Sequence, residues 1–209
     1  MSKAPSIIYV DGFNLYYGAV KDTRYKLLDL ELLFRRLRPG DDIQAIHYFT
    51  ALVEGSHRPH QLVYLNALST LPLVNIILGK FKRKRVQCRV PDCTYQGSRE
   101  FGIPEEKRTD VNMALQMLDD AYQNRADRFV VVSGDSDLVP ALTAVKRISP
   151  MIQITVYVPA RNPVRGAAVE LRAVADKDKT LPFNLVKKSQ FPPILKGGPT
   201  GQIVKPADW

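Results

Sequence analysis

Short apolar runs alternate along the chain with stretches in which apolar residues recur at helical spacing. Apolar runs of roughly four to eight residues are typical of buried strands, whereas apolar residues three and four positions apart are typical of one helix face. The pattern predicts strands near residues 7–10, 43–52, 74–78, 129–133 and 152–158. It predicts helices near residues 30–37, 62–68, 111–122, 138–145 and 169–175.

Strands that alternate with helices predict an α/β fold, with an open, mainly parallel sheet of about five strands and helices on both faces. The connections between parallel strands are expected to be right-handed crossovers. In such folds ligands bind beyond the carboxyl ends of the strands. Residues that directly follow the predicted strands are therefore the first candidates for a functional site.

The helix near residues 111–122 has the strongest apolar stripe. Its predicted buried face consists of Val111, Ala114, Leu115, Leu118, Ala121 and Tyr122. Asp110 precedes Ala114 by four residues and Leu118 by eight, so its side chain is expected on the same face. An acidic side chain at the start of this helix should then point towards the sheet.

Proline and glycine become frequent from about residue 180 onwards. Residues 1–178 are therefore predicted to form one domain, and residues 179–209 an extended tail that packs on the domain or extends from it. A chain of 209 residues with 45% hydrophobic content can form one good core without disulfides. The first residues lack a signal peptide and no apolar run is long enough to cross a membrane, so a cytoplasmic protein is expected.

Cys88 and Cys93 are the two cysteines of the chain, and they lie close together between charged residues. Reduced thiols are the simplest interpretation, because two cysteines do not make a disulfide framework. A zinc site with His57 and His60 is the alternative, although the spacing is looser than in known zinc motifs.

The net charge of +9 favours a polyanionic partner, for which nucleic acid and an anionic membrane surface are the two candidates. The densest charge follows the third predicted strand and comprises Lys80, Lys82, Arg83, Lys84 and Arg85. Contacts with a nucleic-acid backbone would explain this run, with Phe81 or Tyr95 stacking on an unpaired base. A solvated basic loop without a specific partner is the alternative.

Two aspartates directly follow predicted strands. Asp11 ends the first strand and Asp135 follows the fourth, with Gly12 and Gly134 supplying tight turns. Both carboxylates should point into one crevice at the edge of the sheet, together with Asp110. Carboxylates gathered there repel each other and lose hydration, so a bound cation is needed to offset their charge. Oxygen ligands suit Mg²⁺ or Mn²⁺, which also bind phosphate oxygens.

Each aspartate also has a purely structural interpretation. Asp11 could form an ordinary Asp-Gly turn, and Asp110 could be a charge at the helix N-terminus after a Thr109 cap. Asp137, together with Ser136, could cap the helix that follows, so Asp137 is a ligand, a cap or both. Three separate segments that place acids at one sheet edge favour the metal site.

Three segments carry a resemblance to a known family. They are residues 9–15 (YVDGFNL), 106–114 (EKRTDVNMA) and 132–140 (VSGDSDLVP). In order and spacing they resemble the NYN domain family, in its LabA-like branch, and the resemblance covers about residues 6–160. It implies a Rossmann-like PIN fold with an acidic metal site, and an endoribonuclease activity that is established for some members.

The resemblance also implies roles for single residues. The family's metal-binding acids are matched by Asp11, Asp110, Asp135 and, as ligand or cap, Asp137. Asn14 matches an asparagine that orients water, metal or phosphate, and Ser133 matches a small polar residue placed to contact the substrate. Lys107 aligns with a family lysine. Arg108 departs from the family pattern, in which glycine is common.

These residues predict metal-dependent hydrolysis of RNA that leaves a 5′-phosphate, with Lys107 or Arg108 offsetting charge on the phosphate. Single-stranded RNA is the expected partner, no membrane partner is expected, and a homodimer stays open. A phosphatase of the haloacid dehalogenase type is disfavoured, because Phe13 stands where that class needs an aspartate. A dinucleotide enzyme is disfavoured because no glycine-rich loop follows the first strand. The main alternative is a non-catalytic RNA-binding or regulatory module with the same fold.

Overall fold

The computed structural model describes residues 3–161, 169–197, 201–207 and 209. Its centre is a six-stranded sheet in the order β3-β2-β1-β6-β7-β8, in which every neighbouring pair is parallel. The strands are β1 (Ala4–Asp11), β2 (Asp41–Thr50), β3 (Val74–Leu78), β6 (Arg128–Val132), β7 (Gln153–Val158) and β8 (Lys177–Thr180). The predicted fold class is confirmed, and β8 is one strand more than the sequence pattern indicated.

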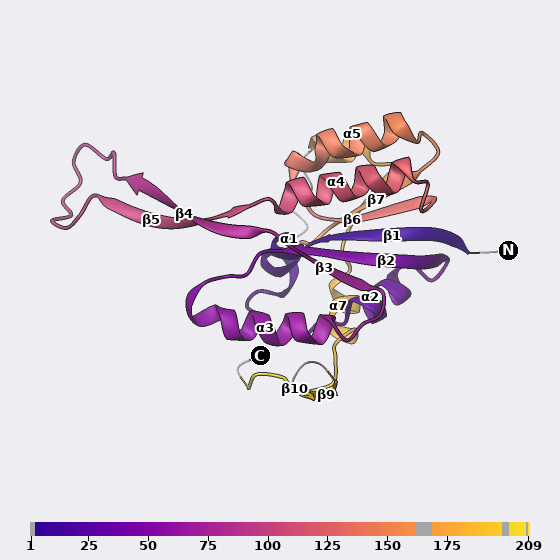
Figure 1. Cartoon of the computed structure of the whole chain (residues 1–209), viewed down its shortest axis with the longest axis horizontal. Coiled ribbons are helices and arrows are strands. Elements are labelled where there is room, and N and C mark those ends of the chain that lie inside the picture. Colours follow the sequence, from indigo (N-terminus) through magenta and orange to yellow (C-terminus); the bar gives the residue numbers. More distant parts are fainter. Residues whose placement is uncertain (1–2, 162–168, 198–200, 208) are drawn as a thin grey trace.

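Helices cover both faces of the sheet (Figure 1). One layer consists of α1 (Gly12–Leu15), α2 (Leu30–Leu37), α3 (Arg58–Leu68) and α7 (Phe183–Lys188). The other consists of α4 (Thr109–Tyr122), α5 (Val139–Ile148) and α6 (Val169–Val174). Side chains of β1 alternate between the two layers. Ile8 and Val10 lie in the core with α2 and α3, whereas Ile7 and Tyr9 lie in the core with α4 and α5.

Helix α4 buries only part of the face that was predicted, namely Ala121 with the partly buried Ala114 and Leu118. Its buried residues include Met113, Met117, Asp120 and Ala121. Val111, Leu115 and Tyr122 are 60%, 60% and 71% exposed, so the prediction that they are buried was wrong. The apolar stripe of this helix is wider than the surface that the sheet covers, and a polar residue occupies part of the covered surface.

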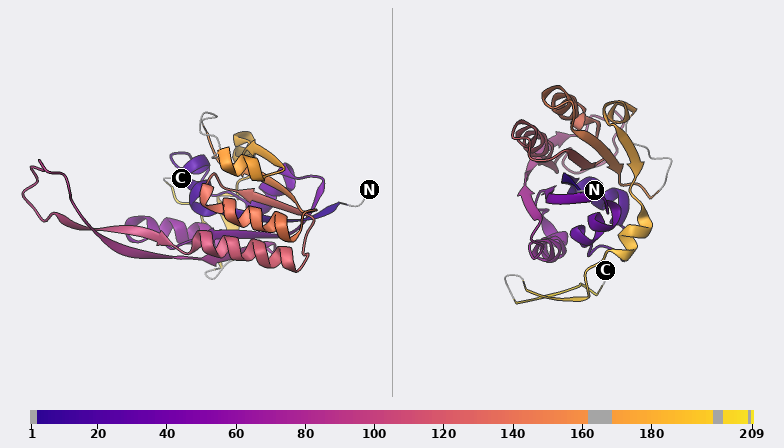
Figure 2. Two further views of the ribbon diagram at one scale, coloured as in Figure 1. Left: turned by 90° about the horizontal axis from the view of Figure 1, so that it is seen from above. Right: turned by 90° about the vertical axis from the view of Figure 1, so that its right-hand side faces the viewer.

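Two antiparallel strands project from the body as an arm (Figures 1 and 2). The arm comprises β4 (Lys80–Gln87), β5 (Glu100–Lys107) and the connecting residues 88–99. At about 3.4 Å per residue, each strand spans about 27 Å. The basic run therefore belongs to a β-ribbon and not to a loop, and its contact with a nucleic-acid backbone stays a prediction. The run lacks the apolar alternation of a typical strand because the ribbon leaves the core.

The C-terminal segment folds back onto the domain. It forms α7 and a small hairpin of β9 (Ile194–Lys196) and β10 (Gln202–Val204). Val186, Phe191 and Ile203 are buried in the core that α2 and α3 share. Part of the segment predicted as extended is thus helical, and β8 lies across the predicted boundary between residues 178 and 179.

Candidate metal centre

The order of the strands reverses between β1 and β6, the two central strands of the sheet. Loops that leave such a pair diverge and open a crevice. Asp11 ends β1 and Asp135 follows β6, so both lie at this crevice. The turn after Asp11 needs glycine, because a Cβ at Gly12 would lie 2.7 Å from the Phe49 carbonyl oxygen.

Three carboxylates meet at the crevice. Asp11, Asp110 and Asp135 each place one oxygen within 4.8 Å of the other two. Asp110 comes from the first turn of α4, so three separate segments contribute. Asp11 is buried and the other two are half-buried. Within the described part of the chain, no Lys, Arg or His side chain forms an ion pair with any of the three.

Asp11 is held in place by hydrogen bonds. Its Oδ1 accepts from the Asn14 backbone N–H at 2.9 Å. Its Oδ2 accepts from the Asn14 amide at 2.6 Å and from the Ser133 hydroxyl at 3.1 Å. Burial raises the pKa of the Asp11 carboxyl, these hydrogen bonds lower it, and the charge of Asp135 raises it further. Asn14 also accepts from the Gly134 N–H at 3.2 Å, which ties the two strand ends together.

Asp135 caps the helical turn that follows it. Its Oδ1 accepts from the Asp137 N–H at 3.0 Å, and its own N–H donates to the Ser133 hydroxyl at 3.1 Å. A short 3₁₀ turn then leads into α5, whose first turn contains Pro140 as predicted. Asp137 is exposed and stands outside the group of three. The alternative interpretation of Asp137 as the cap was wrong, because the neighbouring aspartate fills that role.

Neighbouring acids shift the titration of Asp110. Burial and the negative charges of Asp11, Asp135, Glu106 and Asp137 raise the pKa of the Asp110 carboxyl to about 6. A carboxyl that keeps its proton close to neutral pH indicates a site with an excess of negative charge. Such a site gains most from a cation.

Glu106 is an acid of this region that the sequence analysis missed. One of its carboxylate oxygens accepts from the Thr109 N–H at 3.1 Å and from the Thr109 hydroxyl. Glu106 therefore caps α4, and the expectation of a Thr109 cap was wrong. The available signal was the position of Glu106, three residues before the helix begins, where a side chain can reach the first free N–H groups.

Arg108 joins β5 to α4 through a left-handed backbone conformation, with φ 82°. A non-glycine residue costs roughly 1 kcal/mol there relative to the common right-handed region. The conformation is the one that glycine favours, which accounts for the glycine that is common at this position in the family resembled. Arg108 adopts it at a cost and adds a guanidinium to the groove at the base of the arm.

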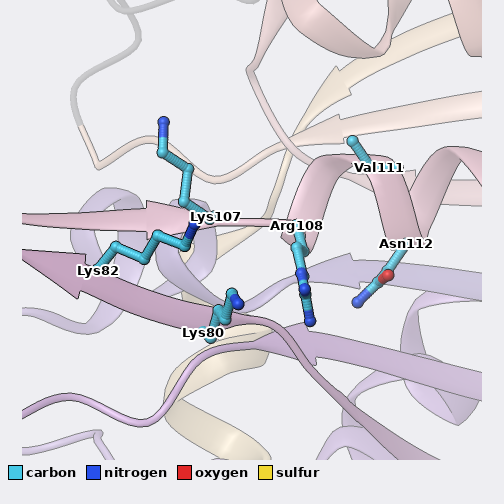
Figure 3. Close-up of a pocket in the computed structure, with 6 residues that line it drawn as sticks. All are labelled: Lys80, Lys82, Lys107, Arg108, Val111 and Asn112. Atoms are coloured by element: carbon cyan, nitrogen blue, oxygen red, sulfur yellow. The ribbon is translucent and has the colours of Figure 1, made fainter.

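A groove lined mainly by cations lies at the base of the arm (Figure 3). The lining residues are Lys80, Lys82, Lys107, Arg108, Val111 and Asn112. Lys107 pairs with Glu105 at 2.9 Å. The guanidinium of Arg108 lowers the pKa of the exposed Lys80 ammonium, which is the effect of crowded like charges. The groove therefore carries positive charge that neighbouring acids such as Glu105 neutralise only in part.

The remaining cations of the arm are divided between its two faces. Strand alternation places Lys82 and Lys84 on one face and Arg83 and Arg85 on the other. Lys84, Arg83 and Arg85 each form an exposed ion pair with a glutamate, at 3.9, 3.4 and 3.5 Å. Exposed pairs of this kind are weak, so these side chains can exchange their partners for a phosphate.

Cys88 and Cys93 are free thiols in the connection at the tip of the arm. In the described ranges, the one group of His, Cys, Asp or Glu close enough to hold a metal is the trio of aspartates. The alternative zinc site with His57 and His60 is therefore not formed among these residues. None of the described helices is both long enough and apolar enough to cross a membrane.

The chain is similar to a known protein family, to a named protein and to a solved structure. The NYN domain matches residues 5–182. The 6-hydroxy-3-succinoylpyridine 3-monooxygenase HspA of Pseudomonas putida is 32% identical, and the match covers 97% of this chain and 74% of that protein. A solved structure of a protein of unknown function from Vibrio parahaemolyticus superposes with a TM-score of 0.55 at 19% identity. That match covers 86% of this chain and 94% of the other, and it shows the fold alone.

Proposed function

Because the chain belongs to the NYN domain family, we propose that it is a metal-dependent ribonuclease that hydrolyses RNA phosphodiester bonds at the aspartate cluster. The observation that carries the proposal is the approach of Asp11, Asp110 and Asp135 to within 4.8 Å, without an ion-pair partner among the described residues. Carboxylates in a purely structural role are ordinarily paired when they are buried. Uncompensated ones leave room for charge brought by a ligand.

The donor set fits Mg²⁺ or Mn²⁺. Both ions prefer oxygen ligands and keep several waters, so three carboxylates at a partly open crevice suit them. A divalent ion bound there would offset the carboxylate charge and lower the pKa of a water molecule enough for attack on phosphorus. The raised pKa of Asp110, about 6, supports this fit because it reflects unbalanced negative charge.

Asn14 and Ser133 act as positioning residues in this proposal. Both donate to Asp11, and the Ser133 hydroxyl also accepts from the Asp135 N–H. Ser133 is fully buried, so contact with substrate, its expected role, is not open to it. The two side chains instead hold Asp11 and Asp135 at a constant separation, which a metal-dependent reaction requires.

The basic groove supplies the substrate contacts. Lys107 and Arg108 line the groove and directly precede α4, whose first turn carries Asp110. In this proposal their charges offset charge that develops on the phosphate. Lys82 in the groove, with Arg83, Lys84 and Arg85 further along the arm, would contact phosphates next to the scissile one. A polymer fits this arrangement better than a small phosphate ester, because the arm extends well beyond the acidic cluster (Figure 1).

A second candidate function comes from the match to HspA, whose name describes a monooxygenase acting on 6-hydroxy-3-succinoylpyridine. The observation that favours it is 32% identity over nearly the whole of this chain. A monooxygenase places one oxygen atom of O₂ on its substrate and reduces the other to water with electrons from an external two-electron donor. Such a reaction makes no evident use of the basic groove, so hydrolysis of RNA is preferred.

The deciding experiment is a cleavage assay on purified protein with mixed single-stranded RNA, and separately DNA, in Mn²⁺ or Mg²⁺. Wild type should cut RNA and leave 5′-phosphate ends, and Asp135→Asn should lower the rate at least about a hundredfold. Asparagine keeps an oxygen that can accept from the Asp137 N–H, so the variant should fold. Asp127→Asn, the same change at the exposed start of β6, is the matched control and should cut normally.

Three other results would point elsewhere. Wild type that binds RNA without cutting it indicates the non-catalytic RNA-binding or regulatory module. Equal cutting by Asp135→Asn indicates a contaminating nuclease or a different site. Consumption of O₂ and reduced nicotinamide on addition of 6-hydroxy-3-succinoylpyridine, with RNA left intact, indicates the monooxygenase.

A further inference from the structure

Four aromatic side chains form a partly exposed cluster between the acidic site and the base of the arm. Phe13, two residues after Asp11, meets Phe81 of β4 edge-on, with ring centroids 5.8 Å apart. Phe13 also lies nearly parallel to Tyr17 at 6.5 Å, and Tyr17 meets Tyr16 edge-on at 5.2 Å. Tyr16 and Tyr17 are 37% and 56% exposed. This aromatic cluster (Phe13, Tyr16, Tyr17 and Phe81) has no part in the hydrolysis proposed above.

The backbone under the cluster is unusual. Helix α1 runs into a π-helical segment, Tyr16–Val20, and such segments are rare and frequent at functional sites. This segment is pressed against the loop after β7, because a Cβ at Gly18 would lie 1.7 Å from the Pro159 carbonyl oxygen. The Arg161 N–H donates to the Gly18 carbonyl at 3.2 Å. One side of the segment is thus anchored while its two tyrosines stay exposed.

Cations flank the aromatic cluster on two sides. The Lys21 ammonium lies 5.1 Å from the centre of the Tyr17 ring. On the arm, Arg83 and Arg85 share a strand face with Phe81, because alternate residues of a strand point the same way. Exposed rings next to cations are the combination that binds single-stranded nucleic acid, with bases stacked on the rings and phosphates held by the cations.

We infer that Phe13, Tyr16, Tyr17 and Phe81 stack unpaired bases of the substrate, so that the protein selects single-stranded RNA. The inference rests on the proposed function for the nature of the substrate. Bases in a duplex already stack on each other and offer no free faces, whereas those of a single strand do. Stacking tolerates every base, so the site reads strandedness rather than sequence.

The test compares two labelled ten-nucleotide probes by fluorescence anisotropy in EDTA, where no cleavage takes place. One probe is single-stranded RNA, and the other has the same sugar-phosphate chain without bases. Repulsion by the metal-free acidic cluster acts on both probes equally. Wild type should bind the RNA on the order of tenfold more tightly than the abasic chain, given the usual contribution of base stacking.

The variants separate stacking from charge. Tyr17→Ala and the double variant Tyr16→Ala/Tyr17→Ala should lose the preference for the base-containing probe, and Tyr17→Phe should keep it. Tyr122→Ala removes a 71% exposed tyrosine from α4, away from the aromatic cluster, and should keep it too. Arg83→Gln should weaken the binding of both probes by the same factor, because both probes carry the same phosphates.

The inference is overturned if wild type binds both probes equally, if Tyr17→Ala keeps the preference, or if a duplex of the same sequence binds as tightly as the single strand. Each of these results leaves the proposed function standing when the wild-type protein still cuts RNA in Mn²⁺. Absence of binding to every RNA probe, together with absence of cleavage, overturns both.

Discussion

Two kinds of carboxylate lie inside this domain, and among the residues that the structure describes only one kind has cationic partners. Asp41, at the start of β2, accepts from Arg38 at 2.6 Å and also from Arg128. Asp120, fully buried in α4, accepts from the Tyr9 hydroxyl at 2.8 Å and from Arg125 at 2.9 Å. These two acids are neutralised by their neighbours and hold helices to the sheet.

The aspartate cluster at the carboxyl edge of the sheet differs in this respect. Two further acids, Glu106 and Asp137, add to the raised pKa of Asp110. The cations of the basic groove are in turn only partly paired with acids. Charge left unbalanced on both sides among the described residues is what the proposed function requires, with a metal ion for the acids and RNA for the cations.

The largest effect on stability is expected at Asp120, one of the two acids that have partners among the described residues. Asp120→Asn should lower the free energy of unfolding by about 3 kcal/mol, because it replaces one buried carboxylate oxygen that accepts hydrogen bonds with an amide nitrogen that cannot accept them. Urea unfolding measures the change. Asp119→Asn, at the exposed neighbouring position, should cost less than about 0.5 kcal/mol. Equal stability of the two variants would contradict a structural role for the buried acid.

Metal addition should stabilise the folded protein by binding at the aspartate cluster, the acids without cationic partners. Mn²⁺ at a hundredfold excess over its Kd should raise the free energy of unfolding by about 2.7 kcal/mol. Thermal unfolding with and without Mn²⁺ measures the shift. Asp135→Asn should lose most of it and Asp127→Asn should keep it. A shift of the same size in both variants would show that the ion binds elsewhere.

A smaller effect is expected at Asp110 in the metal-free protein. Its folded pKa of about 6 is higher than that of an aspartate in an unfolded chain, about 3.9, so the folded state binds the proton more tightly. Stability should therefore rise as the pH falls through 6 towards 4. Asp110→Asn should be about 1 kcal/mol more stable than wild type at pH 7.5, allowing for solvent screening.

Urea unfolding in EDTA at several pH values checks this prediction through the difference between Asp110→Asn and wild type. That difference should shrink as the pH falls and approach zero near about pH 3, where the wild-type carboxyl is mostly protonated in both the folded and the unfolded state. A difference that does not change with pH would mean that Asp110 carries no excess repulsion.

The smallest effect is expected at Arg108, whose side chain lines the basic groove. Arg108→Gly should raise the free energy of unfolding by about 0.5 kcal/mol, since glycine adopts a positive φ without strain. The same change should weaken RNA binding a few-fold by removing one phosphate contact. Arg108→Ala keeps the strain and also loses the cation, so it should weaken binding without the gain in stability. Tighter binding by Arg108→Gly would exclude a role in holding phosphate.

Much of the sheet and part of the site could be predicted from local signals. Asp11 and Asp135 directly follow compact apolar runs, and the carboxyl end of a buried strand in an α/β fold is a site position by topology. Asp110 could be placed by helix phase, because it shares a face with Leu118 and Ala121. These inferences need only spacing along the chain.

Which acids pair with a cation inside the protein could not be predicted from spacing along the chain. Asp110 and Asp120 both lie on α4 and both turn towards the body, yet Arg125 and Tyr9 pair with the second alone. Tyr9 is far from Asp120 in the sequence, and their contact depends on how α4 crosses β1. Helix periodicity likewise predicted that Tyr122 is buried, although its side chain is exposed. Periodicity shows where apolar side chains lie around the helix, but not how much of the helix surface the sheet covers.

The arm has a consequence for how this protein can vary. Lys80 and Lys107 face each other as the first pair of the ribbon, so the chain leaves and re-enters the body at neighbouring points. A short turn could close that gap, and the body would keep its sheet and both helix layers. Insertions and deletions within residues 83–104, between the Phe81 contact and the Glu106 cap, should therefore leave the body intact. Natural selection can lengthen, shorten or recharge the arm as an independent module, which under the proposed function would change which RNAs are held without changing the aspartate cluster.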